Sequence, residues 1–141
     1  MKYCECIVDG AARGNPGEAG CGIVIKLEKK IIKMYFYLGK QTNNYAEYMA
    51  LLYCLKKLIA LKQQVVRIST DSQLVANHMS GSFECKSKTL QPLYQECKEL
   101  FKQFASIEIV QRPREFTKDA DALANLAVDH KTDKEFEYSN F

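Results

Sequence analysis

Apolar and polar positions along this chain of 141 residues divide it into short runs and longer periodic stretches. Apolar runs of strand length come first, at residues 2–9, 21–27 and 31–38. The polar residues 28–30 separate the last two runs, which predicts a hairpin. Residues 10–20 hold several glycines and a proline, so they predict a turn-rich loop after the first strand.

The rest of the chain favours alternating helices and strands. Apolar residues recur with i, i+3, i+4 spacing over 43–62 and again over 89–104, which predicts two amphipathic helices. The remaining predicted elements are a strand at 65–70, a short helix at 72–79, a strand at 107–111 and a helix at 118–129. The tail 131–141 has no clear period, so we expect it to be loosely ordered.

This order of elements predicts the α/β class. A meander of three antiparallel strands followed by helix–strand alternation implies a mixed sheet of five strands, the last two parallel, flanked by about four helices. No repeat or linker divides the sequence, so we expect a single domain over residues 1–130.

Composition narrows the class of protein. Hydrophobic residues make up 47% and charged residues 26% of the chain, as in ordinary globular proteins. The sequence contains neither an apolar run of membrane length nor a signal peptide, so a cytoplasmic protein without a membrane partner is expected. A net charge of +3 permits nucleic-acid binding without requiring it. The six cysteines form no CxxC pair, which favours reduced thiols over a zinc site.

Carboxylates stand next to strand or helix signals in separate parts of the chain. Asp9 ends one predicted strand and Asp71 directly follows another, while Glu47 and Asp121 lie in predicted helices. Adjacent parallel strands place their carboxyl ends side by side, and the two helices can pack over that edge. A lone Asp71 is explained equally well as a helix cap. Four carboxylates in compatible positions instead indicate a site for Mg²⁺ or Mn²⁺, which prefer oxygen ligands.

The segments around these acids resemble a known family. IVDGAARGNPGEAGCG, TNNYAEYMALL, STDSQLV and REFTKDADALAN are similar, in order and separation, to the signature segments of ribonuclease H type 1. The resemblance covers essentially residues 3–129. It implies a ribonuclease H-like fold and an endonuclease that hydrolyses the RNA strand of RNA–DNA hybrids, leaving 5′-phosphate and 3′-hydroxyl ends.

By the same resemblance, Asp9, Glu47, Asp71 and Asp121 match the family's catalytic, metal-binding carboxylates. The resemblance implies two divalent ions, Mg²⁺ with Mn²⁺ as an alternative. Asp9 would bridge both ions, and Asp121 would help hold the ion that carries the attacking water. Glu47 and Asp71 would help hold the ion on the leaving-group side.

Neutral and basic residues near the acids are expected to contact the substrate. Amide side chains suit the 2′-hydroxyl that distinguishes RNA from DNA, because one amide both donates and accepts hydrogen bonds. The residues that match contact positions of the family, or lie beside the acids, are Gly14, Asn15, Thr42, Asn43, Asn44, Ser72, Gln73, Arg112 and Arg114. The alternative for Thr42, Asn43 and Asn44 is a purely structural role, in which they only cap a helix.

The sequence also lacks two features that other members of the family carry. Many members carry a histidine in the loop before the last helix, and the loop QRPREFTKDAD contains none. Residues 80–90 are too short for the basic protrusion of some members, which predicts weak, salt-sensitive hybrid binding through Lys86 and Lys88.

Asp119 is an alternative to Asp121 as the fourth acid of the site. A separation of two residues, however, points the two side chains about 200° apart around a helix, so both cannot face one metal pair.

Other functions are compatible with parts of this pattern. The main alternative is an accessory module that binds hybrids or double-stranded RNA with little or no cleavage. Double-stranded RNA is a second candidate substrate for an active enzyme as well. A transposase or another nuclease of the same broad fold needs different acid spacing and further domains. We expect a monomer.

Overall fold

The computed structural model describes residues 3–139. Its strands are β1 (Cys4–Gly14), β2 (Gly17–Lys26), β3 (Lys30–Gln41), β4 (Val65–Thr70), β5 (Ser106–Gln111) and β6 (Lys134–Ser139). Its helices are α1 (Asn43–Ala60), α2 (Gln73–Ser80), α3 (Gln91–Phe101) and α4 (Lys118–His130), with a 3₁₀ turn, η1 (Arg114–Thr117), directly before α4. No helix of the described part is long and apolar enough to cross a membrane.

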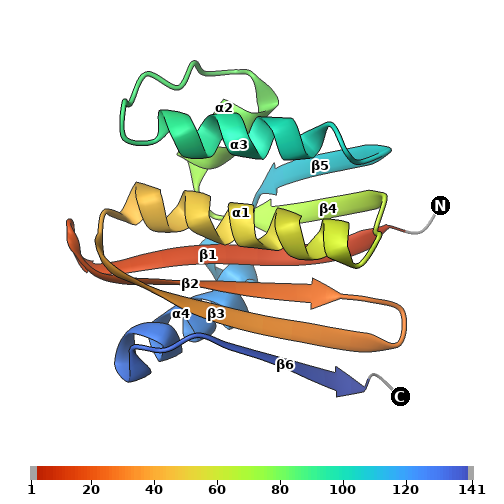
Figure 1. Cartoon of the computed structure of the whole chain (residues 1–141), viewed down its shortest axis with the longest axis horizontal. Helices are drawn as coiled ribbons and strands as arrows, with labels where there is room; N and C mark the ends of the chain where they lie inside the picture. Colours follow the sequence, from red (N-terminus) through yellow and green to blue (C-terminus); the bar gives the residue numbers. More distant parts are fainter. Residues whose placement is uncertain (1–2, 140–141) are drawn as a thin grey trace.

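The strands form one mixed sheet in the order β5-β4-β1-β2-β3-β6 (Figure 1). β1, β2 and β3 are antiparallel neighbours, whereas β4 pairs parallel with β1 and β5 pairs parallel with β4. The predicted α/β class and mixed sheet are therefore confirmed. Because β1 and β4 run in the same direction, their carboxyl ends lie at the same edge of the sheet.

The two faces of the sheet are covered by different helices. Strand residues of one parity, including Cys6 and Val8, pack against α1 in the main core. Residues of the opposite parity, including Ile7 and Val24, pack against α4 in a second cluster. Figure 1 shows α1 and α4 on opposite sides of the sheet. A group on β1 just past the end of its pairing with β4 can therefore meet side chains from both helices.

The prediction of five strands and a loosely ordered tail was wrong. Residues 134–139 form a sixth strand, β6, which pairs antiparallel with β3. Phe136 packs edge-on against Tyr35, with ring centroids 6.4 Å apart, and covers the second cluster. Glu135 and Glu137 on the other side of the strand form ion pairs with Lys57 and Lys30. The remaining tail residues, 140 and 141, lie outside the described residues.

The loop expected at residues 10–20 is also largely strand. β1 continues to Gly14, and β2 begins at Gly17, so a tight turn at Asn15-Pro16 joins them. Gly14 has a φ of +104°, a conformation that favours glycine in such a turn. The β1–β2 hairpin, which contains Asp9 and its neighbours, therefore lies between the two covering helices, α1 and α4.

Candidate active site

Asp9 and Asp71 meet where two parallel strands separate. The pairing of β1 with β4 ends at Ile7 and Ser69, two residues before each acid. Asp9 and Asp71 therefore occupy equivalent positions on neighbouring strands, and alternation points both toward the face that α4 covers. Asp9 is almost fully buried, with 4% of its surface exposed, whereas Asp71 is partly exposed.

Glu47 reaches the same point from the first turns of α1. The helix begins after Thr42, whose side-chain oxygen accepts a hydrogen bond from the Tyr45 amide at 3.2 Å. The Gly10 amide donates to Glu47 Oε1 at 2.7 Å, so the backbone beside Asp9 fixes this carboxylate. Carboxylate oxygens of Asp9, Glu47 and Asp71 all lie within 4.8 Å of one another.

Asp121 approaches from the other face of the sheet. It lies in the first turn of α4 and is partly buried, whereas Asp119 in the same turn is exposed. Asp121 is close enough to contribute to the raised pKa of Asp9. The structure therefore brings Asp9, Glu47 and Asp71 into one cluster and places Asp121 beside Asp9.

The cluster carries more negative charge than its surroundings neutralise. Burial, reinforced by the carboxyls of Asp71 and Asp121, raises the pKa of Asp9 to about 8. The pKa of Glu47 is also raised, first by burial and then by Asp9 and Asp71. Within residues 3–139, the one ion pair that reaches the cluster joins Arg114 Nε to Asp71 Oδ2 at 3.6 Å, and the Arg114 side chain is 85% exposed.

A divalent cation fits this donor set. Oxygen ligands on opposite sides of Mg²⁺ lie about 4 Å apart, which matches carboxylate oxygens gathered within 4.8 Å. The unneutralised carboxylates supply the charge that a hard cation prefers. Asp9, Glu47 and Asp71 are thus the residues able to hold such an ion, with Asp121 next to them.

Two glycines that the sequence did not single out make this arrangement possible. A Cβ on Gly10 would lie 2.3 Å from the Ala46 carbonyl carbon, so only glycine lets α1 bring Glu47 against β1. A Cβ on Gly22 would lie 2.1 Å from the Ala120 carbonyl oxygen, so Gly22 lets α4 approach equally closely. Gly22 pairs directly with Asp9, so both close approaches occur beside the same acid.

The amides expected to contact substrate lie together at the mouth of the hairpin. The Asn15 side-chain oxygen accepts from the Asn43 amide at 3.0 Å, and the Asn43 side-chain oxygen accepts from the Ala12 amide at 2.9 Å. These bonds engage the side-chain oxygens and leave the NH₂ groups available as donors. Gly14 forms the turn beside Asn15, while Thr42 and Asn44 are exposed next to Asn43.

The other expected contact residues follow β4 and β5. Ser72 caps α2 by accepting from the Val75 amide at 3.1 Å, and Gln73 is exposed in the first turn. Arg112 and Arg114 leave the end of β5, on the side of Asp71 away from the amides. The expected contact residues therefore lie on both sides of the carboxylates.

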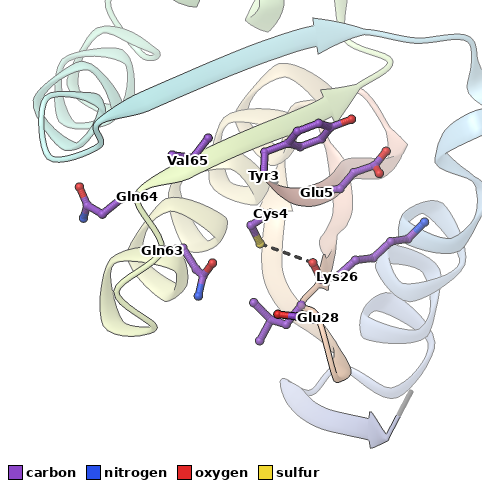
Figure 2. Close-up of a pocket in the computed structure, with 9 residues that line it drawn as sticks. Tyr3, Cys4, Glu5, Lys26, Glu28, Gln63, Gln64 and Val65 are labelled. Carbon is purple, nitrogen blue, oxygen red and sulfur yellow. Dashed lines mark hydrogen bonds between the residues drawn. The ribbon is translucent and has the colours of Figure 1, made fainter. Parts of the chain in front are cut away.

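A hollow of about 730 Å³ at the opposite end of the sheet is separate from this site (Figure 2). Tyr3, Cys4 and Glu5, at the beginning of β1, line it together with Gln63 and other residues. Cys4 is five residues from Asp9, about 16 Å along an extended strand. The carboxylate cluster therefore lies where β1 and β4 separate, and not in this hollow.

Comparison with known proteins places these features in a family. Residues 7–127 match the family described as reverse transcriptase-like. The putative hydrolase EbsB of Enterococcus faecalis is 36% identical over 123 residues, which cover 86% of this chain and 90% of that protein. The bifunctional protein Rv2228c of Mycobacterium tuberculosis is 36% identical over 124 residues, or 86% of this chain, which spans only 34% of that protein's length.

Solved structures agree with the sequence comparison. The crystal structure of RNase H1 from Halobacterium salinarum is 32% identical, with a TM-score of 0.83 over 92% of this chain and 99% of that chain. The structure of LC11-RNase H1 in complex with an RNA/DNA hybrid is 31% identical, with a TM-score of 0.84 and the same coverage of both chains.

Proposed function

Because the chain belongs to the ribonuclease H type 1 family, we propose that it is an endonuclease that hydrolyses the RNA strand of RNA–DNA hybrids. The observation that carries this proposal is the cluster of Asp9, Glu47 and Asp71 at the edge of the sheet, with Asp121 beside it. The hybrid bound in the LC11-RNase H1 structure supports the choice of substrate.

Two divalent ions, Mg²⁺ with Mn²⁺ as a substitute, complete the proposed site. Asp9 would help hold both ions, because it belongs to the cluster with Glu47 and Asp71 and also lies beside Asp121. When bound, such ions lower the pKa of the attacking water and stabilise the attacking and leaving oxygens of an in-line displacement. The expected products carry 5′-phosphate and 3′-hydroxyl ends.

The residues of the chain supply position and charge for this reaction. The Gly10 amide holds the Glu47 carboxylate in place, so this side chain is preorganised before substrate arrives. Arg114, 85% exposed beside Asp71, can turn toward a phosphate, although arginine cannot shuttle a proton near neutral pH. Without a loop histidine, proton transfer to the leaving oxygen is assigned to solvent.

Recognition of RNA is proposed to come from the amides at the hairpin mouth. The free NH₂ groups of Asn15 and Asn43 are suited to sugar hydroxyls, with Asn44 and Gln73 exposed nearby. Thr42 and Ser72, already used as helix caps, and the Gly14 turn complete the proposed contact surface. We also propose a monomer, and we propose that it acts in the cytoplasm, a compartment that the six free cysteines support.

Cleavage of matched labelled duplexes tests the proposal. The protein should cut the RNA strand of an RNA–DNA hybrid in Mg²⁺ and leave a DNA–DNA duplex of the same sequence intact. An RNA–RNA duplex tests the wider substrate range. If the hybrid is bound but stays uncut in Mg²⁺ and in Mn²⁺, the alternative of an accessory binding module is correct.

A further inference from the structure

Arg112 occupies a defined position at the end of β5. Its backbone amide donates to the Thr70 carbonyl oxygen at 2.8 Å and so extends the β4–β5 pairing by one residue. Its guanidinium carbon lies 5.0 Å from the centre of the Phe116 ring, which holds the planar group against η1. The side chain is partly buried, and Nε is fully covered.

The charge of Arg112 has no anionic partner among the residues that the structure describes. Within residues 3–139 it forms no ion pair, and its buried Nε has no hydrogen-bond acceptor. Arg67 on β4 provides a direct contrast, because it also stacks on an aromatic ring, that of Tyr3, at 4.2 Å. Arg67 Nε, however, donates to Glu108 Oε1 at 2.6 Å. A partly buried guanidinium without an acceptor is costly unless an anion arrives.

The position of Arg112 relates it to the carboxylates. The registers β1–β4 and β4–β5, continued past the strand ends, align Asp9, Asp71 and Arg112 in one row. Alternation directs all three toward the face that carries α4 and η1. Arg67 lies on this same face but in the first half of β4, beside Tyr3, which lines the hollow. Of the two stacked arginines, only Arg112 is next to the proposed site.

We infer that Arg112 is a positioning residue that binds a phosphate of the RNA strand next to the scissile one. This inference rests on the proposed function and adds a contact with one particular phosphate. The oxyanion supplies the acceptor that the guanidinium lacks, and two parallel N–H···O bonds suit the planar fork. Phe116 fixes the plane of the fork, so the contact orients the strand over the carboxylates.

Neutralising one phosphate at a time tests this contact. Each RNA linkage near the cut receives a methylphosphonate with a 2′-O-methyl group on its sugar, and the control substrate has the same 2′-O-methyl group with an ordinary phosphate. For the parent, one linkage next to the cut should raise KM about tenfold when neutralised, as expected for a lost charge-assisted hydrogen bond. In Arg112→Met, which keeps the apolar stem over Phe116, the same replacement should have no effect.

Further variants separate this role from packing. On the unmodified hybrid, Arg112→Met should raise KM about tenfold, leave kcat nearly unchanged and lower the salt slope of binding by about 0.9. Arg112→Lys should recover part of the affinity, because it keeps the charge and loses the fork. Arg67→Met is the matched control, and its KM and salt slope should equal those of the parent.

Two results would overturn the inference. One is an Arg112→Met enzyme with parental KM and salt slope. The other is an Arg112→Met enzyme that remains as sensitive as the parent to every neutralised linkage, because the guanidinium then contacts no phosphate. Both are distinct from failure of the proposed function, in which the parent itself does not cut the hybrid.

Discussion

Replacing Asp9 with asparagine should abolish hybrid cleavage and yet stabilise the metal-free protein. Asp9 is 4% exposed, and burial together with the carboxyls of Asp71 and Asp121 raises its pKa to about 8. The folded protein must therefore either keep a proton on Asp9 or bury a charge among other charges. Asparagine has nearly the same shape but carries no charge and takes up no proton. The substitution should therefore remove the free-energy cost of this buried carboxyl together with catalysis.

The size of this gain follows from the pKa. With a pKa of 3.8 in the unfolded chain and about 8 in the folded one, the penalty at pH 7 spans about three pH units, or roughly 4 kcal/mol. Because the pKa of Glu47 is also raised and this carboxyl can take up part of the proton, we expect a gain of roughly 2–4 kcal/mol for Asp9→Asn. That corresponds to a rise in melting temperature on the order of 10 °C.

The effect should depend on pH with a defined sign. The folded state binds the proton more tightly than the unfolded chain, so the parent loses stability as pH rises from about 4 to about 8 and levels off above. The difference between Asp9→Asn and the parent should be near zero at pH 4 and grow toward pH 8. Chemical denaturation in EDTA at several pH values measures this difference in stability. When Mg²⁺ replaces EDTA, the stability of the parent should rise and that of Asp9→Asn should not.

Asp119→Asn is the matched control, because Asp119 is an exposed acid of α4 outside the cluster. It should leave cleavage at the parental rate and should not stabilise the protein in EDTA at pH 7. A variant Asp9→Asn that is less stable than the parent in EDTA at pH 7 would refute the reasoning. Equal differences at pH 4 and pH 8 would refute it as well, because the gain would then not come from the carboxylate charge.

Three further substitutions have defined outcomes. Glu47→Gln keeps an oxygen for the Gly10 amide and should fold normally, but its cleavage rate should fall at least about 100-fold, since outer-shell changes alone cost 10–100-fold at metal sites. Cleavage at the parental rate would exclude Glu47 from the site. Gly22→Ala should lower stability by roughly 1–3 kcal/mol and reduce kcat, because the added Cβ meets the Ala120 carbonyl and displaces α4; thermal melts and initial rates measure both. Phe136→Ala should cost roughly 1–2 kcal/mol in denaturant melts with kcat unchanged, because the ring is half-buried and β6 is far from the carboxylates.

The sequence predicted those parts of the fold whose signals are local. The helical spacing of residues 43–62 and the apolar run 65–70 correspond closely to α1 and β4. Asp71 directly after that run and Asp9 at the end of the first predicted strand predict that the two acids lie side by side, although β1 in fact continues past Asp9 to Gly14. Their proximity follows from parallel pairing, which the order of the elements already implied.

Other features depend on contacts between distant segments. The alternation of Glu135, Phe136 and Glu137 is a strand signal of period two, but the lysines that pair with its charged residues, Lys57 and Lys30, come from distant segments. The local context of Gly10 and Gly22 predicts only loop or strand. Their need for glycine comes from helices α1 and α4, which arrive from far along the chain.

Cleavage of an end-labelled RNA–DNA hybrid by metal-depleted protein, with Mg²⁺ then added back, tests the central claim most directly. The proposed function predicts no cutting in EDTA, RNA-strand cutting with 5′-phosphate and 3′-hydroxyl ends once Mg²⁺ is restored, and none from Asp9→Asn at the same Mg²⁺ concentration. Cutting that persists in EDTA, or equal cutting by Asp9→Asn, would contradict a metal-dependent site built on the Asp9, Glu47 and Asp71 carboxylates.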